Sequence, residues 1–234
     1  MTNKNNLDQS LWDFHQTKNA NDLIQGHSRQ NYISNLVFKK IRESSKILEI
    51  GFGDAYLLKK LSANYQCYGA DISPKNIQQM KIKFNNIKFD LIKTDGKLPY
   101  KENYFDAFIA SEVLEHMDDE ELKKCITEIH RILKPNGIAI ITIPAKENLN
   151  DNTCYCPKCK HTFHKWGHKQ SFNEEKINNL FNKFLKKEIN IIYTRYKGKT
   201  IIEKMLGYIM WTGRTIIGKI TYISGGNYLI KLKK

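Results

Sequence analysis

The sequence predicts a single α/β domain, in which helices cover both faces of a largely parallel β-sheet. Short apolar segments typical of buried strands alternate along the chain with segments whose apolar residues recur at helical spacing. Strands that alternate with helices imply crossover connections, and crossover connections join parallel strands. The chain has 234 residues, of which 41% are hydrophobic, so it can bury one sizeable core.

The expected elements follow one another in a regular order. Residues 7–42 are expected to form one or two helices ahead of the first strand, because their apolar residues recur at roughly helical spacing. Seven strands are expected over residues 46–50, 65–70, 87–92, 104–110, 137–143, 187–196 and 228–232. Further helices are expected over residues 55–61, 74–84, 118–133, 173–185 and 199–218.

A change of composition after Pro144 divides the chain. Residues 146–170 are polar and rich in Cys and His, which is typical of an insertion between core elements. We therefore expect N-terminal helices over residues 1–45, a core over 46–145, the insertion over 146–170, and a C-terminal part over 171–234 that completes the sheet.

The formal net charge of +14 is unevenly distributed, because the segment from Lys186 to Lys234 holds eleven Lys or Arg residues and two Glu residues. A basic segment suits an anionic partner such as a phosphorylated substrate, RNA or a membrane surface. A solvated, Lys-rich face that keeps the protein soluble explains the charge equally well. The charge therefore permits a nucleic-acid partner without requiring one.

The protein is expected to be cytoplasmic. Its N-terminal segment lacks the apolar core of a secretory signal, and no long uncharged apolar stretch suggests a membrane-spanning helix. Three of the five cysteines fall within six residues, which is more typical of a metal cluster in a reducing compartment than of a disulfide framework. The apolar helix expected within residues 200–220 could make peripheral contact with a membrane, but packing on the sheet or forming a homodimer face is the favoured interpretation.

A Gly-x-Gly turn joins the first expected strand to the following helix, in the segment from Glu49 to Ala55. Gly51 and Gly53 let the backbone turn sharply and approach a ligand, because neither carries a Cβ atom. The N–H groups at the N-terminus of the next helix are also available to a ligand. Many nucleotide-binding α/β proteins share such a turn, so it is weak evidence when taken alone.

Asp71 ends the second expected strand, about 20 residues after the glycines. A carboxylate there can accept hydrogen bonds from both ribose hydroxyls of a nucleoside. The alternative is a turn or helix-capping role ahead of Ser73 and Pro74, and the upstream glycines favour the ribose role. These features alone would also fit an NAD-dependent dehydrogenase.

Four segments in series resemble the class I S-adenosylmethionine-dependent methyltransferases, in the branch that methylates small molecules and lipids. They are ILEIGFG (47–53), GADIS (69–73), DGKLPYKENYFDAFIASEVLEHM (95–117) and LKPNGIAIITIP (133–144). The resemblance implies a Rossmann-like, doubly wound sheet of seven mostly parallel strands with an antiparallel last strand. It also implies S-adenosylmethionine as the cofactor.

The resemblance also suggests which positions contact the cofactor. Glu49, Gly51 and Gly53 would line its methionine and ribose end, and Ser111 would lie near the methionine moiety. The remaining positions would hold the nucleoside: Asp71 the ribose hydroxyls, Ile72 one face of the adenine, and Asp95, beside Gly96, the adenine amino group. His116 would close the helix after the fourth strand, and Ala55 stands where the family often has a third glycine.

The insertion holds six potential metal ligands within 15 residues: Cys154, Cys156, Cys159, His161, His164 and His168. Cys156-x2-Cys159 has the spacing of a zinc knuckle, in which a tight turn directs two thiolates at one metal ion. A tetrahedral site needs two further ligands, with His164 and either Cys154 or His161 as the candidates. We therefore predict a structural zinc ion, and the alternative is a polar loop with surface thiols.

His168 has two competing interpretations. The segment from Gly167 to Phe172 resembles the stretch after the fifth strand of many of these methyltransferases, where a His precedes a helix that covers the acceptor. His168 would then act on the acceptor as a base or positioning group, since His exchanges protons near neutral pH. Zinc ligation is the alternative, and contact with the acceptor is slightly favoured.

Two acceptor classes fit the sequence best. Exocyclic adenine methylation is disfavoured because Ala110–Val113 lacks the Asn/Asp-Pro-Pro-aromatic loop, and pyrimidine C5 methylation because no unclustered cysteine follows a proline. The first remaining hypothesis is O-methylation of a small molecule, a sugar or a surface-glycan precursor. The second is an RNA-modifying enzyme that uses the zinc module and the basic tail to hold phosphates. A non-enzymatic scaffold is a third.

Overall fold

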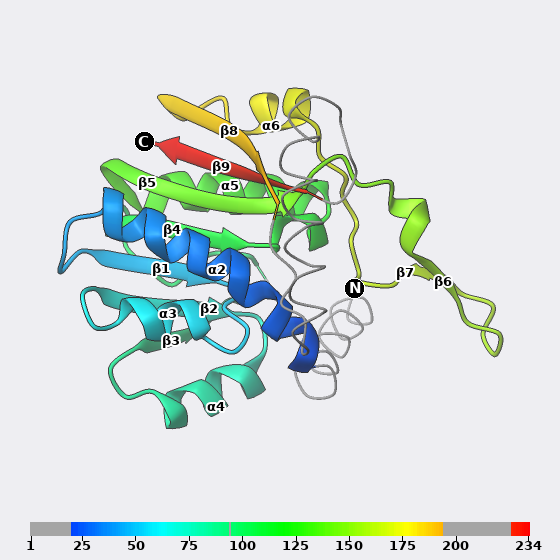
Figure 1. Cartoon of the computed structure of the whole chain (residues 1–234), viewed down its shortest axis with the longest axis horizontal. Coiled ribbons are helices and arrows are strands. Elements are labelled where there is room, and N and C mark those ends of the chain that lie inside the picture. Colours follow the sequence, from blue (N-terminus) through cyan, green and yellow to red (C-terminus); the bar gives the residue numbers. More distant parts are fainter. Residues whose placement is uncertain (1–19, 94, 194–225) are drawn as a thin grey trace, which may run out of the picture.

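The structure is a computed structural model that describes residues 20–93, 95–193 and 226–234. Its strands form one seven-stranded sheet and a separate two-stranded hairpin (Figure 1). The large sheet contains β1 (Lys46–Ile50), β2 (Gln66–Asp71), β3 (Lys88–Leu91), β4 (Phe105–Ser111), β5 (Leu133–Pro144), β8 (Lys186–Ile192) and β9 (Asn227–Lys233). The hairpin consists of β6 (Thr153–Tyr155) and β7 (Thr162–His164).

The strand order of the large sheet is β3-β2-β1-β4-β5-β9-β8. Strands β1 to β5 pair in parallel, whereas β9 pairs antiparallel with β5 on one side and with β8 on the other. The expected α/β fold, with seven mostly parallel strands and an antiparallel last strand, is therefore confirmed. The strand order reverses between β1 and β4, and in such sheets ligands bind beyond the carboxyl ends of the strands at this point.

Helices cover both faces of the sheet (Figure 1). Among the described residues, the α-helices are α2 (Ala20–Lys40), α3 (Tyr56–Leu61), α4 (Pro74–Lys83), α5 (Asp119–Ile132) and α6 (Glu174–Leu180), and the 3-10 helices are η1 (Leu114–His116) and η2 (Leu149–Asn152). Buried side chains of α2, α3 and α4 belong to one hydrophobic cluster, and those of α5 and α6 belong to another. Alternate side chains of β1 point to opposite faces, so Ile47 joins the first cluster and Leu48 the second.

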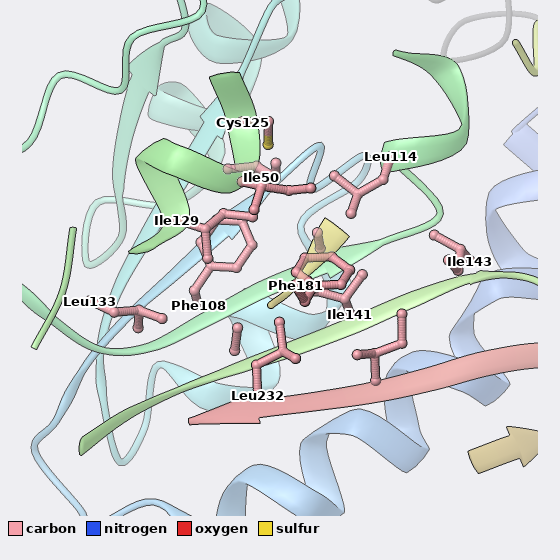
Figure 2. Packing of buried hydrophobic residues seen from close by; sticks show 14 of the residues in the cluster. Ile50, Phe108, Leu114, Cys125, Ile129, Leu133, Ile141, Ile143, Phe181 and Leu232 are labelled. Atoms are coloured by element: carbon pink, nitrogen blue, oxygen red, sulfur yellow. The ribbon is translucent and has the colours of Figure 1, made fainter. Parts of the chain in front are cut away.

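The cluster that contains buried side chains of α5 and α6 is the larger of the two, and through it the segment around α6 packs against the sheet. Figure 2 shows Phe108 of β4 and Ile141 of β5 packed with Ile129 of α5. Phe181, which directly follows α6, is fully buried in the same cluster. Burial of a large aromatic side chain provides much of the free energy that holds such a segment in place.

Local sequence signals set the starts of two helices. Ser73 caps α4 by accepting a hydrogen bond from the N–H of Asn76, and Pro74 begins the helix. Asp118 and Glu121 form a capping box at the start of α5, where each side chain accepts a hydrogen bond from the other residue's N–H. These devices explain why both helices begin within one residue of the expected position.

Several boundaries differ from expectation. β5 begins at Leu133, before the expected start, because Leu133 already pairs with Phe105 ahead of a register shift. α6 ends at Leu180, where Phe181 leaves the helical conformation to enter the core. The expected helix over residues 199–218 lies outside the described residues, as does the N-terminal part of the helices expected over 7–42. Among the described helices, none has the length and hydropathy needed to cross a membrane.

Candidate cofactor site and acceptor edge

The turn after β1 is built so that only glycine fits at its first position. Gly51 has φ 61°, and its N–H donates a hydrogen bond to the Ala70 carbonyl oxygen at 2.9 Å. A Cβ atom on Gly51 would lie 2.6 Å from Cγ2 of Val113. Gly53 also has a left-handed backbone, with φ 55°, and its carbonyl oxygen accepts a hydrogen bond from Nδ2 of Asn76. The turn from Gly51 to Gly53, called the cradle below, therefore presents backbone without a side chain at two positions of the carboxyl end of β1.

Glu49 of β1 has a buried carboxyl group, one oxygen of which accepts no hydrogen bond from the described residues. Its side chain is 1% exposed, and Oε2 has no hydrogen-bond partner among the described residues. Burial, and then the charge of Asp54, raise the pKa of Glu49 well above its ordinary value. A buried acceptor without a partner is uncommon in folded proteins. Glu49 is therefore suited to accept a hydrogen bond from a ligand in the cradle.

Asp71 ends β2 and has the turn role that the sequence left open. Its Oδ1 accepts a hydrogen bond from the N–H of Ser73 at 2.9 Å, and its Oδ2 accepts one from Nδ2 of Asn76 at 3.2 Å. Each carboxylate oxygen can accept a second hydrogen bond, so this role is compatible with binding a ribose. The next residue, Ile72, is 46% exposed and offers an apolar surface beside the carboxylate.

Asp95 and Gly96 lie in the loop after β3. Oδ1 of Asp95 accepts a hydrogen bond from the N–H of Lys97 at 3.0 Å, and the side chain is exposed. Gly96 has φ 75°, and no atom lies within 4 Å of the position of its missing Cβ. The two residues line a shallow depression together with side chains of α5.

Ser111, at the end of β4, links the sheet to α2. Its Oγ accepts hydrogen bonds from Nε of Arg29 at 3.0 Å and from Oγ1 of Thr142 at 3.2 Å. Glu112 follows with φ 56°, and its Oε2 accepts a hydrogen bond from Nδ2 of Asn227 at 2.7 Å. Arg29 is not predictable as part of this site, because nothing near it in the sequence distinguishes it from the other basic residues of the chain.

The hairpin divides the predicted zinc ligands. Cys154 pairs with Phe163 and Thr153 pairs with His164, so Cys154 and His164 point to opposite faces of the hairpin. Cys156 and Cys159 lie in the turn, where the N–H and thiol of Cys159 lower the pKa of Cys156. In the described residues this pair supplies half of a tetrahedral site. The ring of His161 stacks near that of Phe163, with centroids 6.2 Å apart.

Cys156 and Cys159 in the turn of the hairpin are the predicted zinc ligands that lie close together. We predict that Cys156→Ser with Cys159→Ser removes about one zinc ion per chain and leaves the melting temperature nearly unchanged, because neither cysteine belongs to the two hydrophobic clusters. Elemental analysis of protein purified without a metal-affinity tag, followed by thermal unfolding, measures both quantities. Equal zinc contents in the two proteins would contradict the prediction.

A second cluster of ionisable groups lies at the base of the hairpin. His168 Nδ1 lies 2.5 Å from Oε2 of Glu147, and the ring of His168 stacks on that of His164 with centroids 4.6 Å apart. The ring of His116 packs edge-on against His168 at 4.8 Å. Glu115, which precedes His116, is fully buried, and neither of its carboxyl oxygens has a hydrogen-bond partner in the part of the chain that the structure describes.

The surroundings set the protonation of this cluster. Burial and the charge of His168 lower the pKa of His116 to about 3, so His116 is neutral at physiological pH. Burial, and then the charge of Glu112, raise the pKa of Glu115 well above its ordinary value. Burial would also raise the pKa of Glu147, but the hydrogen bond and charge of His168 outweigh it and lower that pKa. Glu147 is therefore the anionic partner of His168.

Known proteins share the central part of this architecture. Residues 48–141 match the family model described as a methyltransferase domain. This part of the chain is therefore identified as a methyltransferase domain. A solved structure, the complex between the Haloferax volcanii Trm112 methyltransferase activator and the putative methyltransferase, contains a chain of the same fold, with a TM-score of 0.66 and 16% identity over 95% of this chain and 96% of that one.

Curated relatives match the methyltransferase domain over about half of this chain. A tRNA (carboxymethyluridine(34)-5-O)-methyltransferase of Arabidopsis thaliana is 35% identical over 112 residues, which are 47% of this chain and 26% of that protein. The mitochondrial arginine-hydroxylase NDUFAF5 of Danio rerio is 26% identical over 125 residues, or 52% of this chain and 38% of that protein. The chain thus spans less than half of the length of these relatives, whose names describe different reactions.

Proposed function

We propose that this protein transfers the methyl group of S-adenosylmethionine to an oxygen atom of its acceptor. The observation that carries the proposal is the cradle at the end of β1, where Gly51 has no room for a side chain and Glu49 holds a buried, unused acceptor. These features fit a ligand that brings its own hydrogen-bond donors close to the backbone. When bound, the cofactor supplies a methyl group that its sulfonium charge already activates.

The cofactor positions proposed from the sequence fit this arrangement. Glu49 and the glycine turn would hold the methionine and ribose end, and Ser111, already bonded to Arg29, would lie beside it. Asp71, which also holds the turn into α4, would accept hydrogen bonds from the ribose hydroxyls. The exposed side chain of Ile72 would pack on the adenine, and Asp95 with Gly96 would complete the adenine site.

His168 is proposed to act on the acceptor side. Its Nδ1 faces a carboxylate oxygen of Glu147, which can only accept a hydrogen bond, so Nδ1 carries the proton. In the neutral ring Nε2 carries the lone pair, which can act on an acceptor hydroxyl. The carboxylate also fixes the tautomer and orientation of the ring, as an orienting group does for a catalytic histidine.

Two acceptor classes remain candidates for this oxygen chemistry. The first is a hydroxylated small molecule, a sugar or a surface-glycan precursor, acted on in the cytoplasm. The second is RNA, which the name of the Arabidopsis relative favours, since that protein is a tRNA 5-O-methyltransferase. The net charge of +14 also suits a polyanionic acceptor. A homodimer and peripheral membrane contact stay predictions, because their basis, residues 200–220, lies outside the described residues.

The test is transfer of a radiolabelled methyl group to two separate pools, total cellular RNA and a low-molecular-mass extract. We predict that one pool gives labelled methyl ether, and that His168→Ala lowers the rate about 10²- to 10⁴-fold while affinity for S-adenosylhomocysteine stays the same. His130→Ala, which alters a histidine of α5 against Phe184, is the control and should retain full activity. Cofactor binding with no labelled product in either pool would favour the scaffold hypothesis.

A further inference from the structure

Two segments far apart in the sequence are docked together at the carboxyl edge of β4. The carbonyl oxygen of Glu115 accepts hydrogen bonds from the N–H groups of Lys169 and Gln170, at 2.7 and 3.0 Å. The carbonyl oxygen of Gly167 lies 3.3 Å from Nδ1 of His116. These contacts bring His168 beside η1, so that one ligand atom from each of Glu115, His116 and His168 lies within 4.8 Å of the others.

The carboxyl group of Glu115 is the first indication of a ligand. It is fully buried, and neither oxygen has a hydrogen-bond partner among the described residues. Burying a carboxyl group in this way is costly unless a cation or a donor compensates for it. Oε1 of Glu112, three residues earlier, is also buried and has no hydrogen-bond partner in the described part of the chain, although Nε of Arg29 lies 3.9 Å away. Arg29 thus contacts the carboxylate of Glu112, whereas no described side chain donates a hydrogen bond to the carboxyl group of Glu115.

The two imidazoles provide the second indication. Nδ1 of His116 faces the Gly167 carbonyl oxygen, and Nδ1 of His168 faces the Glu147 carboxylate. Both oxygens are acceptors, so in the neutral rings each Nδ1 atom carries the proton and each Nε2 atom carries the lone pair. Metal-binding histidines characteristically donate their other N–H to a carbonyl or carboxylate oxygen in this way, which fixes the tautomer that ligates.

We propose that Glu115, His116 and His168 bind a divalent cation of the first transition series, such as Zn²⁺, Mn²⁺ or Co²⁺. Two imidazoles and one carboxylate suit these ions. Three protein ligands leave coordination positions open for an acceptor oxygen. The role of the cation rests on the proposed oxygen methylation, whereas its binding does not.

In this role the cation replaces His168 as the group that acidifies the acceptor hydroxyl, because Nε2 of His168 gives its lone pair to the ion. The hydroxyl loses its proton to solvent water, and the cation stabilises the resulting negative charge. The oxygen then forms a bond to the methyl carbon as the carbon–sulfur bond breaks, and that electron pair stays on sulfur. The products are the methyl ether, S-adenosylhomocysteine and one proton.

Glu147 and His164 support this centre without ligating the ion. Nδ1 of His164 accepts a hydrogen bond from the N–H of His168 at 3.0 Å, so the proton of a neutral His164 lies on Nε2 and that atom has no lone pair to offer. Glu147 accepts the Nδ1 proton of His168 and is held in turn by Nδ2 of Asn152 at 3.3 Å. We therefore assign Glu147 and His164 to positioning the ligand His168.

The test is a Co²⁺ titration of chelator-treated protein that carries Cys156→Ser and Cys159→Ser, followed by calorimetry and visible absorption. Removal of the thiols leaves the imidazole and carboxylate site to be measured alone. We predict one bound Co²⁺ per chain. Glu115→Gln and His168→Gln should each lower the affinity by more than about 100-fold, and Glu147→Gln by about 10- to 100-fold, the range typical of residues that orient a ligand.

Affinity for S-adenosylhomocysteine separates this proposal from the proposed function. It should be unchanged in Glu115→Gln, which also shows that the variant is folded, and His168→Gln provides a second test on a less buried residue. Failure of the thiol-free protein to bind Co²⁺, Mn²⁺ or Zn²⁺ would overturn the cation site. The same holds if Glu115→Gln and His168→Gln both bind Co²⁺ as tightly as their parent. If the wild-type protein did not bind S-adenosylhomocysteine, the proposed function would instead be overturned.

Discussion

Gly51→Arg is expected to abolish binding of S-adenosylhomocysteine. A Cβ atom at this position meets Cγ2 of Val113 at 2.6 Å, and the φ of 61° is unfavourable for any residue with a side chain. Val113 is β-branched and has little rotational freedom with which to move away. The Arg side chain would also extend into the cradle proposed for the cofactor. Isothermal titration calorimetry should detect no binding.

Asp71→Asn is expected to weaken binding of S-adenosylhomocysteine without abolishing it. The Asn Oδ1 can still accept the hydrogen bond from the Ser73 N–H, so the turn into α4 should persist. Loss of the negative charge should weaken the ribose contact by about 10- to 150-fold, the range for hydrogen bonds to charged groups. Thermal unfolding of both variants controls for misfolding. If both folded variants bound the ligand as tightly as wild type, the cofactor assignment would be wrong.

Phe181→Ala is expected to lower the free energy of unfolding by about 3–5 kcal/mol, the usual cost of a large cavity in a well-packed core. The Phe181 ring is fully buried in the cluster that joins α6 to β4, β5 and α5 (Figure 2). Single domains are stable by only about 5–15 kcal/mol, so this loss is a large fraction of the total. Equilibrium unfolding in urea measures it.

Leu185→Ala is the matched control for this variant. Leu185 lies four residues further along the same segment, but its side chain is 80% exposed. Its substitution should change the free energy of unfolding by less than about 0.5 kcal/mol. A similar loss in both variants would mean that burial of Phe181 does not anchor this segment.

The fold could be predicted from the sequence because its signals are local. The apolar segment from Ile47 to Ile50 ends at a glycine turn, and Ser73-Pro74 and Asp118 mark helix starts that depend on contacts within four residues. The boundaries that differ depend on distant residues. Leu133 extends β5 because Phe105 pairs with it, and Phe181 ends α6 because the core accepts its ring. Neither partner is visible in a local pattern.

The candidate site also combines residues that local motifs predict with residues that only the fold brings together. Gly51 and Asp71 belong to short motifs, so their positions at one sheet edge follow from the parallel topology. The proposed cation site joins Glu115 to His168, 53 positions apart, and its key feature is the hydrogen bond made by the far nitrogen of each ring. The cysteines and histidines that lie close together in the sequence instead predict a metal site in the hairpin. Closeness in the sequence does not reveal ligands that come together only in the folded chain.

The position of β9 has a consequence for how the protein is synthesised. β9 lies between β5 and β8, and β8 pairs with no other described strand. While a ribosome is still translating the residues before Asn227, β8 and one edge of β5 lack β9, the described strand with which both pair. Exposed strand edges recruit other chains. Any pause in translation before this point therefore prolongs the interval in which the nascent polypeptide depends on chaperones to avoid aggregation.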